Sequence, residues 1–214
     1  MYVPTLSVTV PSMNQAMQED SKPFPPRLPG IFRPKDLAEF GISVDQLRAW
    51  VRRGDAERIG RGLYRQRDAE LTEQDTIVRV CTKVPRAIVC LLTALHLHGI
   101  GTQLPREVWI ALDRKARKPK LDDLPARIVR FSGPMLTYAV ESQKIQGIQV
   151  RITSPARTIV DCFRYRKRIG LDVALEALRD GLRSKQVTIE KLRRAAEVCR
   201  IQTVIRPYLE SMAS

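Results

Sequence analysis

Between residues 46 and 65 the chain gathers side chains that can read and hold a DNA duplex. An arginine can donate two hydrogen bonds to the edge of a guanine, and a glutamine can pair in the same way with an adenine. Basic side chains beside the base-reading set can bond the phosphates and fix the orientation of the protein. The candidates for base contact are Gln46, Arg48, Ala49, Arg52 and Arg53, and those for phosphate or minor-groove contact are Arg58, Arg61 and Arg65. This set predicts a site for double-stranded DNA.

A second basic cluster lies in the segment 114–120, where five of seven residues are basic and no acid follows before Asp122. Its members Lys115, Arg117 and Lys118 are candidates for phosphate contact, because each basic side chain placed on a phosphate releases a condensed counterion. A solvated loop with no ligand is the alternative interpretation, and the sequence leaves both open.

Groups that could bind a metal or support catalysis are sparse. The two histidines, His96 and His98, would point about 200° apart on a helix, so they cannot share a metal ion and are expected to pack or cap. The sequence contains no phosphate-binding glycine motif and no zinc-like spacing of cysteines. We therefore predict no metal, no cofactor and no catalytic residue.

Carboxylates offer two further candidate sites. A nuclease-like centre would have to pair Asp113, at a predicted strand end, with Glu141 and Lys144. Asp161 falls early in a predicted helix, where a negative charge interacts favourably with the helix dipole. It could also form an ion pair with Arg157, four residues earlier, or contact a partner.

Residues that start and end helices predict, over residues 31–68, the elements that must position the DNA-contacting set. Pro34 suits the first turn of a helix, and Gly41 ends that helix. Ser43 and Gln46 form a capping box at the start of a second helix. Val44, Leu47, Trp50 and Val51 form its apolar stripe, so we expect Leu47, Trp50 and Val51 to be buried and the candidate contact residues to face outward. A hairpin with Gly60-Arg61-Gly62 at its tip follows, as a wing follows a recognition helix.

The rest of the chain predicts an arm and a larger domain. Six prolines occur in residues 1–30, which favours a flexible arm with one weak helix at about residues 12–19. Residues 69–214 alternate predicted strands with helices, and the last third is helical. The expected fold class is α+β, with a winged helix-turn-helix over residues 31–68 followed by a larger α+β domain over residues 69–214.

Composition narrows the class of protein further. The formal charge is +14, and residues 71–214 carry most of it, with 26 Lys or Arg against 14 Asp or Glu. Such an excess favours a polyanionic partner. The four cysteines form no C-x-x-C pair and are expected to be buried free thiols, which suits the reducing cytoplasm. No apolar run reaches the ~18 residues of a membrane span, and no signal peptide is predicted.

The ordered motifs resemble those of a known family. Residues 33–43, Leu47, residues 51–54 and residues 61–64 are similar to the winged-helix domain of AbiEi-type antitoxins. The resemblance continues in a second domain, through residues 90–95, 98–99, 104–105, 108–109, 152–158 and 160–161. The family normally has a further helix before Pro34, where this chain has the proline-rich segment 22–29; the sequence places that helix at residues 12–19 or lacks it.

The resemblance implies a transcriptional autorepressor and antitoxin of a type IV toxin–antitoxin system. Its N-terminal domain would bind inverted repeats in its own promoter, and its second domain would neutralise a nucleotidyltransferase-like toxin encoded nearby. Two other interpretations stay open at this stage. The second domain could be a nuclease-like or other catalytic module, or the winged helix could serve dimerisation in a pure interaction protein.

Overall fold

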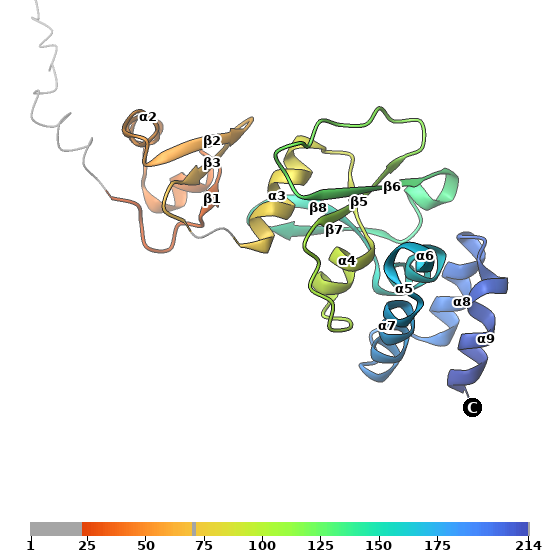
Figure 1. Ribbon diagram of the computed structural model, residues 1–214. Coiled ribbons are helices and arrows are strands. Elements are labelled where there is room, and N and C mark those ends of the chain that lie inside the picture. The colour runs from red at the N-terminus through yellow and green to blue at the C-terminus, as the bar shows by residue number, and fades with distance from the viewer. Residues whose placement is uncertain (1–22, 70–71, 214) are drawn as a thin grey trace, which may run out of the picture. The chain divides into compact units, whose positions relative to one another are not determined.

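The computed structural model describes residues 23–69 and 72–213, and the chain divides into two compact units between Leu71 and Thr72 (Figure 1). Each unit combines helices with a sheet of its own, so the α+β class is confirmed. Within the described ranges, no helix combines the length and the apolar character that crossing a membrane requires. The weak helix predicted at residues 12–19 lies outside the described residues.

The N-terminal unit is a winged helix-turn-helix. Its elements are strand β1 (Ile31–Phe32), the short 3-10 helix η1 (Asp36–Phe40), helix α2 (Val44–Arg53) and strands β2 (Ala56–Gly60) and β3 (Leu63–Gln66). The three strands form an antiparallel sheet in the order β1-β3-β2, which ties the entry segment to the wing. Strand β1 was not predicted from the sequence, because two residues are too few to show a period.

Local chemistry places α2 where the sequence predicted it. The Oγ atom of Ser43 accepts a hydrogen bond from the backbone N–H of Gln46 at 3.1 Å, which satisfies one of the donors at the helix start. Gly41 has φ +65°, a left-handed conformation that only glycine adopts without strain, and it turns the chain from η1 into α2.

The core of this small unit extends upstream of residue 31. Leu28 is buried with Phe32, Leu37, Leu47 and Trp50, and the ring of Phe24 lies 4.2 Å from that of Trp50, measured between centroids. Three short strands and two helices leave one side of the tryptophan open, and the segment from Phe24 to Leu28 covers it. This segment therefore belongs to the N-terminal unit, and the flexible arm predicted for residues 1–30 is wrong for residues 24–28.

The C-terminal unit is a five-stranded mixed sheet with helices on both faces. Its strands are β4 (Ile88–Val89), β5 (Val108–Asp113), β6 (Ala126–Phe131), β7 (Val140–Ile145) and β8 (Ile148–Thr153), in the order β6-β5-β4-β8-β7. Its helices are α3 (Glu73–Lys83), α4 (Leu91–His98), α5 (Pro155–Arg164), α6 (Arg166–Ile169), α7 (Leu171–Arg183), α8 (Ile189–Val198) and α9 (Gln202–Ala213), with a 3-10 turn η2 (Gly133–Leu136).

Helix α5 is the centre of this unit, with α4, α7, α8 and α9 packed around it (Figure 1). The core on this side of the sheet includes Trp109, Phe131, Ile159, Phe163 and Leu178. Helix α3 packs against β5 and β8 through its own apolar face. The sheet residues that alternate with the α5 side, such as Ile110 and Leu112, are also buried, so both faces of the sheet are covered.

All four cysteines are buried free thiols, as predicted. Burial raises the pKa of Cys81 to about 12 and that of Cys199 to about 11, and it raises the pKa values of Cys90 and Cys162 well above the usual range. Because the thiolate is the reactive form, we expect no labelling of the native chain by a disulfide reagent at pH 8. The same reagent should label four thiols per chain in denaturant, and rapid labelling of any thiol in the native chain would contradict this packing.

Candidate nucleic-acid interface

Helix α2 presents one polar face and buries the other. The buried residues are Gln46, Leu47, Ala49 and Trp50, whereas the exposed face is centred on Arg48, whose side chain is 68% exposed. Arg52, one turn further along, is exposed as well, whereas Arg53 is exposed but lies about 140° around the helix from Arg48 and pairs with Asp55 at 2.7 Å. A helix that is braced by η1 and a wing, and that turns arginines outward, has the geometry of a recognition helix.

Two of the predicted base-contacting residues are not available for contact. Gln46 and Ala49 are buried, and Val51, which we expected in the core, is exposed. The buried face is rotated by roughly 80° from the predicted one, at 100° per residue. Phe24 and Leu28 add to the core around Leu47 and Trp50, and this contribution from upstream of residue 31 is not visible in the sequence of the helix alone.

The exposed face contains residues that the sequence analysis missed. Val44 is 53% and Val51 is 38% exposed, and they flank Arg48 on the same face. Asp45 lies beside them and accepts a hydrogen bond from Nη1 of Arg48 at 2.7 Å. The Asp45 carboxylate would therefore compete with DNA for the guanidinium group of Arg48.

The wing carries three arginines in different environments. Arg61 is exposed at the two-residue turn between β2 and β3, which Gly62 makes possible with φ +64°. Arg58 is also exposed, and its Nε donates to the carbonyl of Gly60 at 3.2 Å. The side chain of Arg65 is mostly buried and pairs with Glu57 at 2.9 Å, so Arg65 supports the wing more than it offers a charge to a ligand.

The basic loop of the C-terminal unit follows β5 and projects exposed cations. Lys115, Arg117 and Lys118 are all exposed. The start of the loop is held in place, since Nη1 of Arg130 donates to the carbonyls of Asp113 and Ala116, each at 2.9 Å. A loop with an ordered base and exposed cations can bind phosphate without a large ordering cost.

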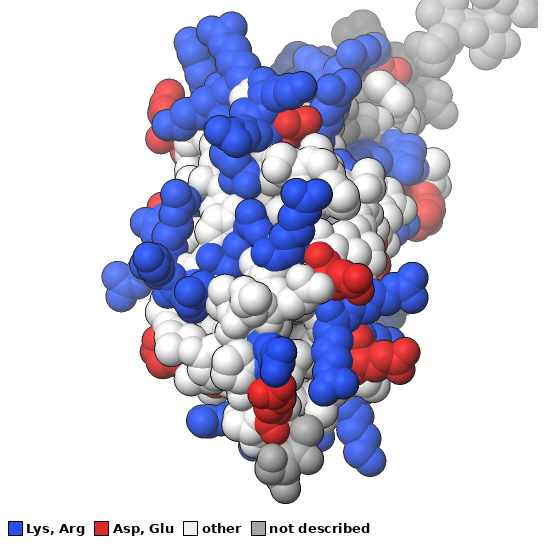
Figure 2. All heavy atoms as spheres, turned by 90° about the vertical axis from the view of Figure 1, so that its right-hand side faces the viewer, with Lys and Arg blue, Asp and Glu red and all other residues white. Residues whose placement is uncertain are grey.

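More basic residues lie on the helical face of this unit. Figure 2 shows that face, where Lys and Arg side chains are spread widely with Asp and Glu between them. The exposed basic residues of the helices include Lys167, Arg168, Arg193, Arg194 and Arg206. The positive field of the C-terminal unit therefore extends well beyond the basic loop.

The residues of the predicted nuclease-like centre do not come together. Asp113 lies on β5, and Glu141 and Lys144 lie on β7. Strands β4 and β8 separate these two strands, which places them roughly 14 Å apart at three inter-strand spacings. Among residues 23–69 and 72–213, no three metal-binding side chains cluster. The histidines also diverge, with Nε2 of His96 on Glu73 at 2.8 Å and Nε2 of His98 on the carbonyl of Thr153 at 2.7 Å.

Arg157 and Asp161 form a fully buried ion pair in α5, as their spacing suggested. Nε of Arg157 donates to Oδ2 of Asp161 at 2.9 Å, and its Nη atoms donate to the carbonyls of Tyr138 and Met135 at 2.8 and 3.1 Å. The guanidinium also lies 5.0 Å from the ring centre of Phe131. This arginine therefore joins α5 to the segment that precedes β7, and Asp161 is part of the core and not of a contact surface.

Asp161 gives the C-terminal unit a predictable response to pH. Burial raises the pKa of its carboxyl to about 6, although Arg157 acts in the opposite direction. An aspartate in an unfolded chain has a pKa of about 4. Between about pH 4 and pH 6 the folded chain retains a proton that the unfolded chain releases, so the stabilising contribution of Asp161 falls as the pH rises through this window.

We expect this effect in a comparison of wild type with Asp161→Asn. The free energy of unfolding of wild type, minus that of the variant, should decrease between pH 4 and pH 6.5 by an amount on the order of 3 kcal/mol. Chemical denaturation at several pH values measures it. Parallel pH profiles for the two proteins would contradict the assignment.

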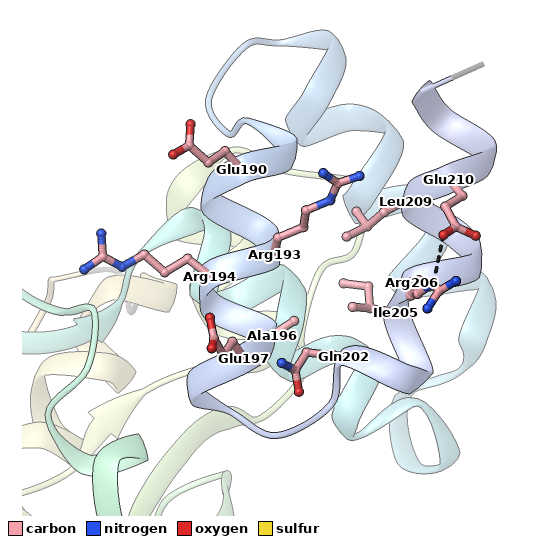
Figure 3. Close-up of a pocket in the computed structure, with 10 residues that line it drawn as sticks. All are labelled: Glu190, Arg193, Arg194, Ala196, Glu197, Gln202, Ile205, Arg206, Leu209 and Glu210. Carbon is pink, nitrogen blue, oxygen red and sulfur yellow. Dashed lines mark hydrogen bonds and ion pairs between the residues drawn. The ribbon is translucent and has the colours of Figure 1, made fainter.

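A groove of about 610 Å³ lies between α8 and α9 (Figure 3). Ala196, Ile205 and Leu209 form its floor, and Nε of Arg206 donates to Glu210 at 2.8 Å on its rim. Three acidic and three basic residues line it, namely Glu190, Glu197, Glu210, Arg193, Arg194 and Arg206. This balance of charge makes the groove less suited to a polyanion than the basic loop.

A winged helix-turn-helix with an outward arginine face, followed by a separate α+β unit, defines a DNA-binding transcription regulator with a second domain. Two family models match the chain: residues 26–65 match one described as a transcriptional regulator, AbiEi antitoxin, and residues 87–208 match the AbiEi antitoxin C-terminal domain. The chain belongs to the AbiEi antitoxin family, as the resemblance of its motifs predicted. A search of curated proteins found no match.

Proposed function

We propose that the chain is the autorepressor and antitoxin of a type IV toxin–antitoxin system. It acts in the cytoplasm, binds inverted repeats in its own promoter and neutralises a nucleotidyltransferase-like toxin encoded nearby, without catalysis of its own. The observation that carries this proposal is the exposed face of α2 around Arg48, beside a wing with Arg61 at its tip. The family assignment supports the antitoxin role of the second unit.

In this proposal the contacts with DNA come from both units. Arg48 and Arg52 face the major groove, and Arg58 and Arg61 bond phosphates or enter the minor groove. Lys115, Arg117 and Lys118 add phosphate contacts that do not depend on sequence. Their exposure supports this division of roles.

The repressor role is tested by a gel shift with the DNA upstream of the gene. Wild type should bind this duplex more tightly than a scrambled duplex of equal length and composition at about 150 mM salt, where non-specific contacts are screened. Equal affinity for both duplexes would refute sequence-specific repression.

The antitoxin role requires a separate assay. Co-expression of the full chain with the adjacent gene should relieve the growth arrest that the adjacent gene causes alone. A variant that carries Arg48→Ala and Arg52→Ala should still relieve the arrest if neutralisation belongs to the C-terminal unit. Arrest that persists with the wild-type chain would reject the antitoxin role and leave the repressor role standing.

Lys118→Ala tests the phosphate contacts of the basic loop. We expect weaker binding to all DNA sequences alike and a decrease of about one in the slope of log affinity against log salt, because about one counterion fewer is released. Affinity measured from 50 to 200 mM salt gives the slope. Lys185→Ala, an exposed lysine between α7 and α8, is the control, and an unchanged slope in Lys118→Ala would exclude the loop from the interface.

A further inference from the structure

Two valines on the outward face of α2 lie outside the core of the N-terminal unit. Of the large hydrophobic side chains in residues 23–69 and 72–213, four are exposed, and Val44 and Val51 are two of them. Branched side chains at Cβ are weak helix formers, so helix propensity does not account for their presence. Neither packs into the core of the N-terminal unit, which is built from Leu47, Trp50 and their neighbours.

The valines share their face with charged groups that fit DNA better than a protein core. Arg48 projects between Val44 and Val51, and Asp45 lies beside it. A second protein seated there would have to bury an arginine and an aspartate, which is costly unless both are matched. A major groove instead offers guanine acceptors to the arginine and thymine methyl groups to the apolar side chains.

We infer that Val44 and Val51 select thymines through contact with their C5 methyl groups, on either side of a guanine bonded by Arg48. This inference rests on the proposed DNA-binding function and specifies the half-site that it reads. Seven residues of helix span about 10 Å, which corresponds to about three base-pair steps. The methyl-bearing positions and the guanine therefore fall within one stretch of three to four base pairs.

The experiment begins with duplexes recovered by the full chain from a randomised library. Each thymine of the recovered half-site is replaced in turn by deoxyuridine, which removes the methyl group and keeps the base pairing. We expect one or two positions at which wild type loses affinity about fourfold, the effect of one buried methyl group. Val44→Ala should be insensitive to deoxyuridine at one of these positions, and Val51→Ala at the other.

The control variant is Leu104→Ala, because Leu104 is a 71% exposed side chain of the C-terminal unit. It should respond to deoxyuridine as wild type does. Alanine favours helix more than valine does, so loss of α2 does not complicate the result.

Several outcomes would overturn the inference. If no deoxyuridine changes wild-type affinity more than twofold while Arg48→Ala still impairs binding, the methyl contacts are absent and the DNA-binding function stands. If each valine variant, compared with wild type, loses the same factor in affinity on the deoxyuridine duplex as on the thymine duplex, the valines do not read methyl groups. A change of oligomeric state in these variants would assign the face to a protein interface. Failure to recover any sequence from the library would refute the proposed function together with the inference.

Discussion

Replacement of Arg157 by leucine is expected to lower the free energy of unfolding of the C-terminal unit by about 3–5 kcal/mol. The substitution leaves Asp161 as a buried carboxylate without its cation, and it removes the donors to the carbonyls of Tyr138 and Met135. Within the described residues Oδ1 of Asp161 has no hydrogen-bond partner, and Arg164 acts on the carboxylate only through its charge. Denaturant unfolding followed by circular dichroism measures the loss.

The protein contains a closely matched control for this substitution. Arg206 and Glu210 have the same four-residue spacing and an N–O distance of 2.8 Å, but both side chains are exposed. Arg206→Leu should cost less than about 1 kcal/mol, because water already screens the pair. A double variant, Arg157→Leu with Asp161→Leu, should recover part of the loss, since no charge then remains buried. If Arg157→Leu costs no more than Arg206→Leu, the buried pair has no special role in stability.

Loss of the outward arginines of α2 should have the largest effect on DNA binding. We expect Arg48→Ala and Arg52→Ala each to reduce the preference for the specific duplex by about 1–3 kcal/mol, or roughly 5- to 150-fold, while affinity for random DNA changes little. Competition between specific and scrambled duplexes measures this preference directly.

The matched control here is Arg183→Ala. Arg183 pairs with Asp180 three residues earlier, as Arg48 pairs with Asp45, and it is 83% exposed. The two variants thus lose the same charge and the same kind of ion pair. Equal loss of preference in Arg48→Ala and Arg183→Ala would show a general effect of charge and would contradict the assignment of α2 as the base-reading helix.

The sequence was most informative where structure depends on near neighbours. Ser43, Gly41 and Gly62 predicted the start of α2, the turn before it and the wing, because caps and tight turns are set within a few residues. The Arg157–Asp161 pair followed in the same way from its spacing on one helix face. From these features the sequence correctly located the winged-helix unit and its candidate DNA-contacting helix.

The sequence was least informative where burial depends on distant segments. Gln46 and Ala49 were predicted to be exposed, yet both are buried, and the core beside α2 includes Phe24 and Leu28 from a segment that was predicted to be an arm. The nuclease-like set Asp113, Glu141 and Lys144 could be excluded only when the strand order was known. Both outcomes depend on how segments separated by 18 or more residues are arranged, and such an arrangement leaves no periodic pattern in the sequence.

The central strand of the C-terminal sheet has a consequence for how this unit assembles. Strand β4 comprises two residues, yet it alone connects the β5–β6 pair with the β7–β8 hairpin. The hairpin closes locally through a two-residue turn at Gln146-Gly147, with six paired positions. Bringing β8 beside β4 closes a loop of more than 60 residues for two paired positions, which is entropically unfavourable until the helices pack. We therefore expect the β7–β8 hairpin to form early in refolding. The pairing of β4 with β8 should form last, together with the docking of α5.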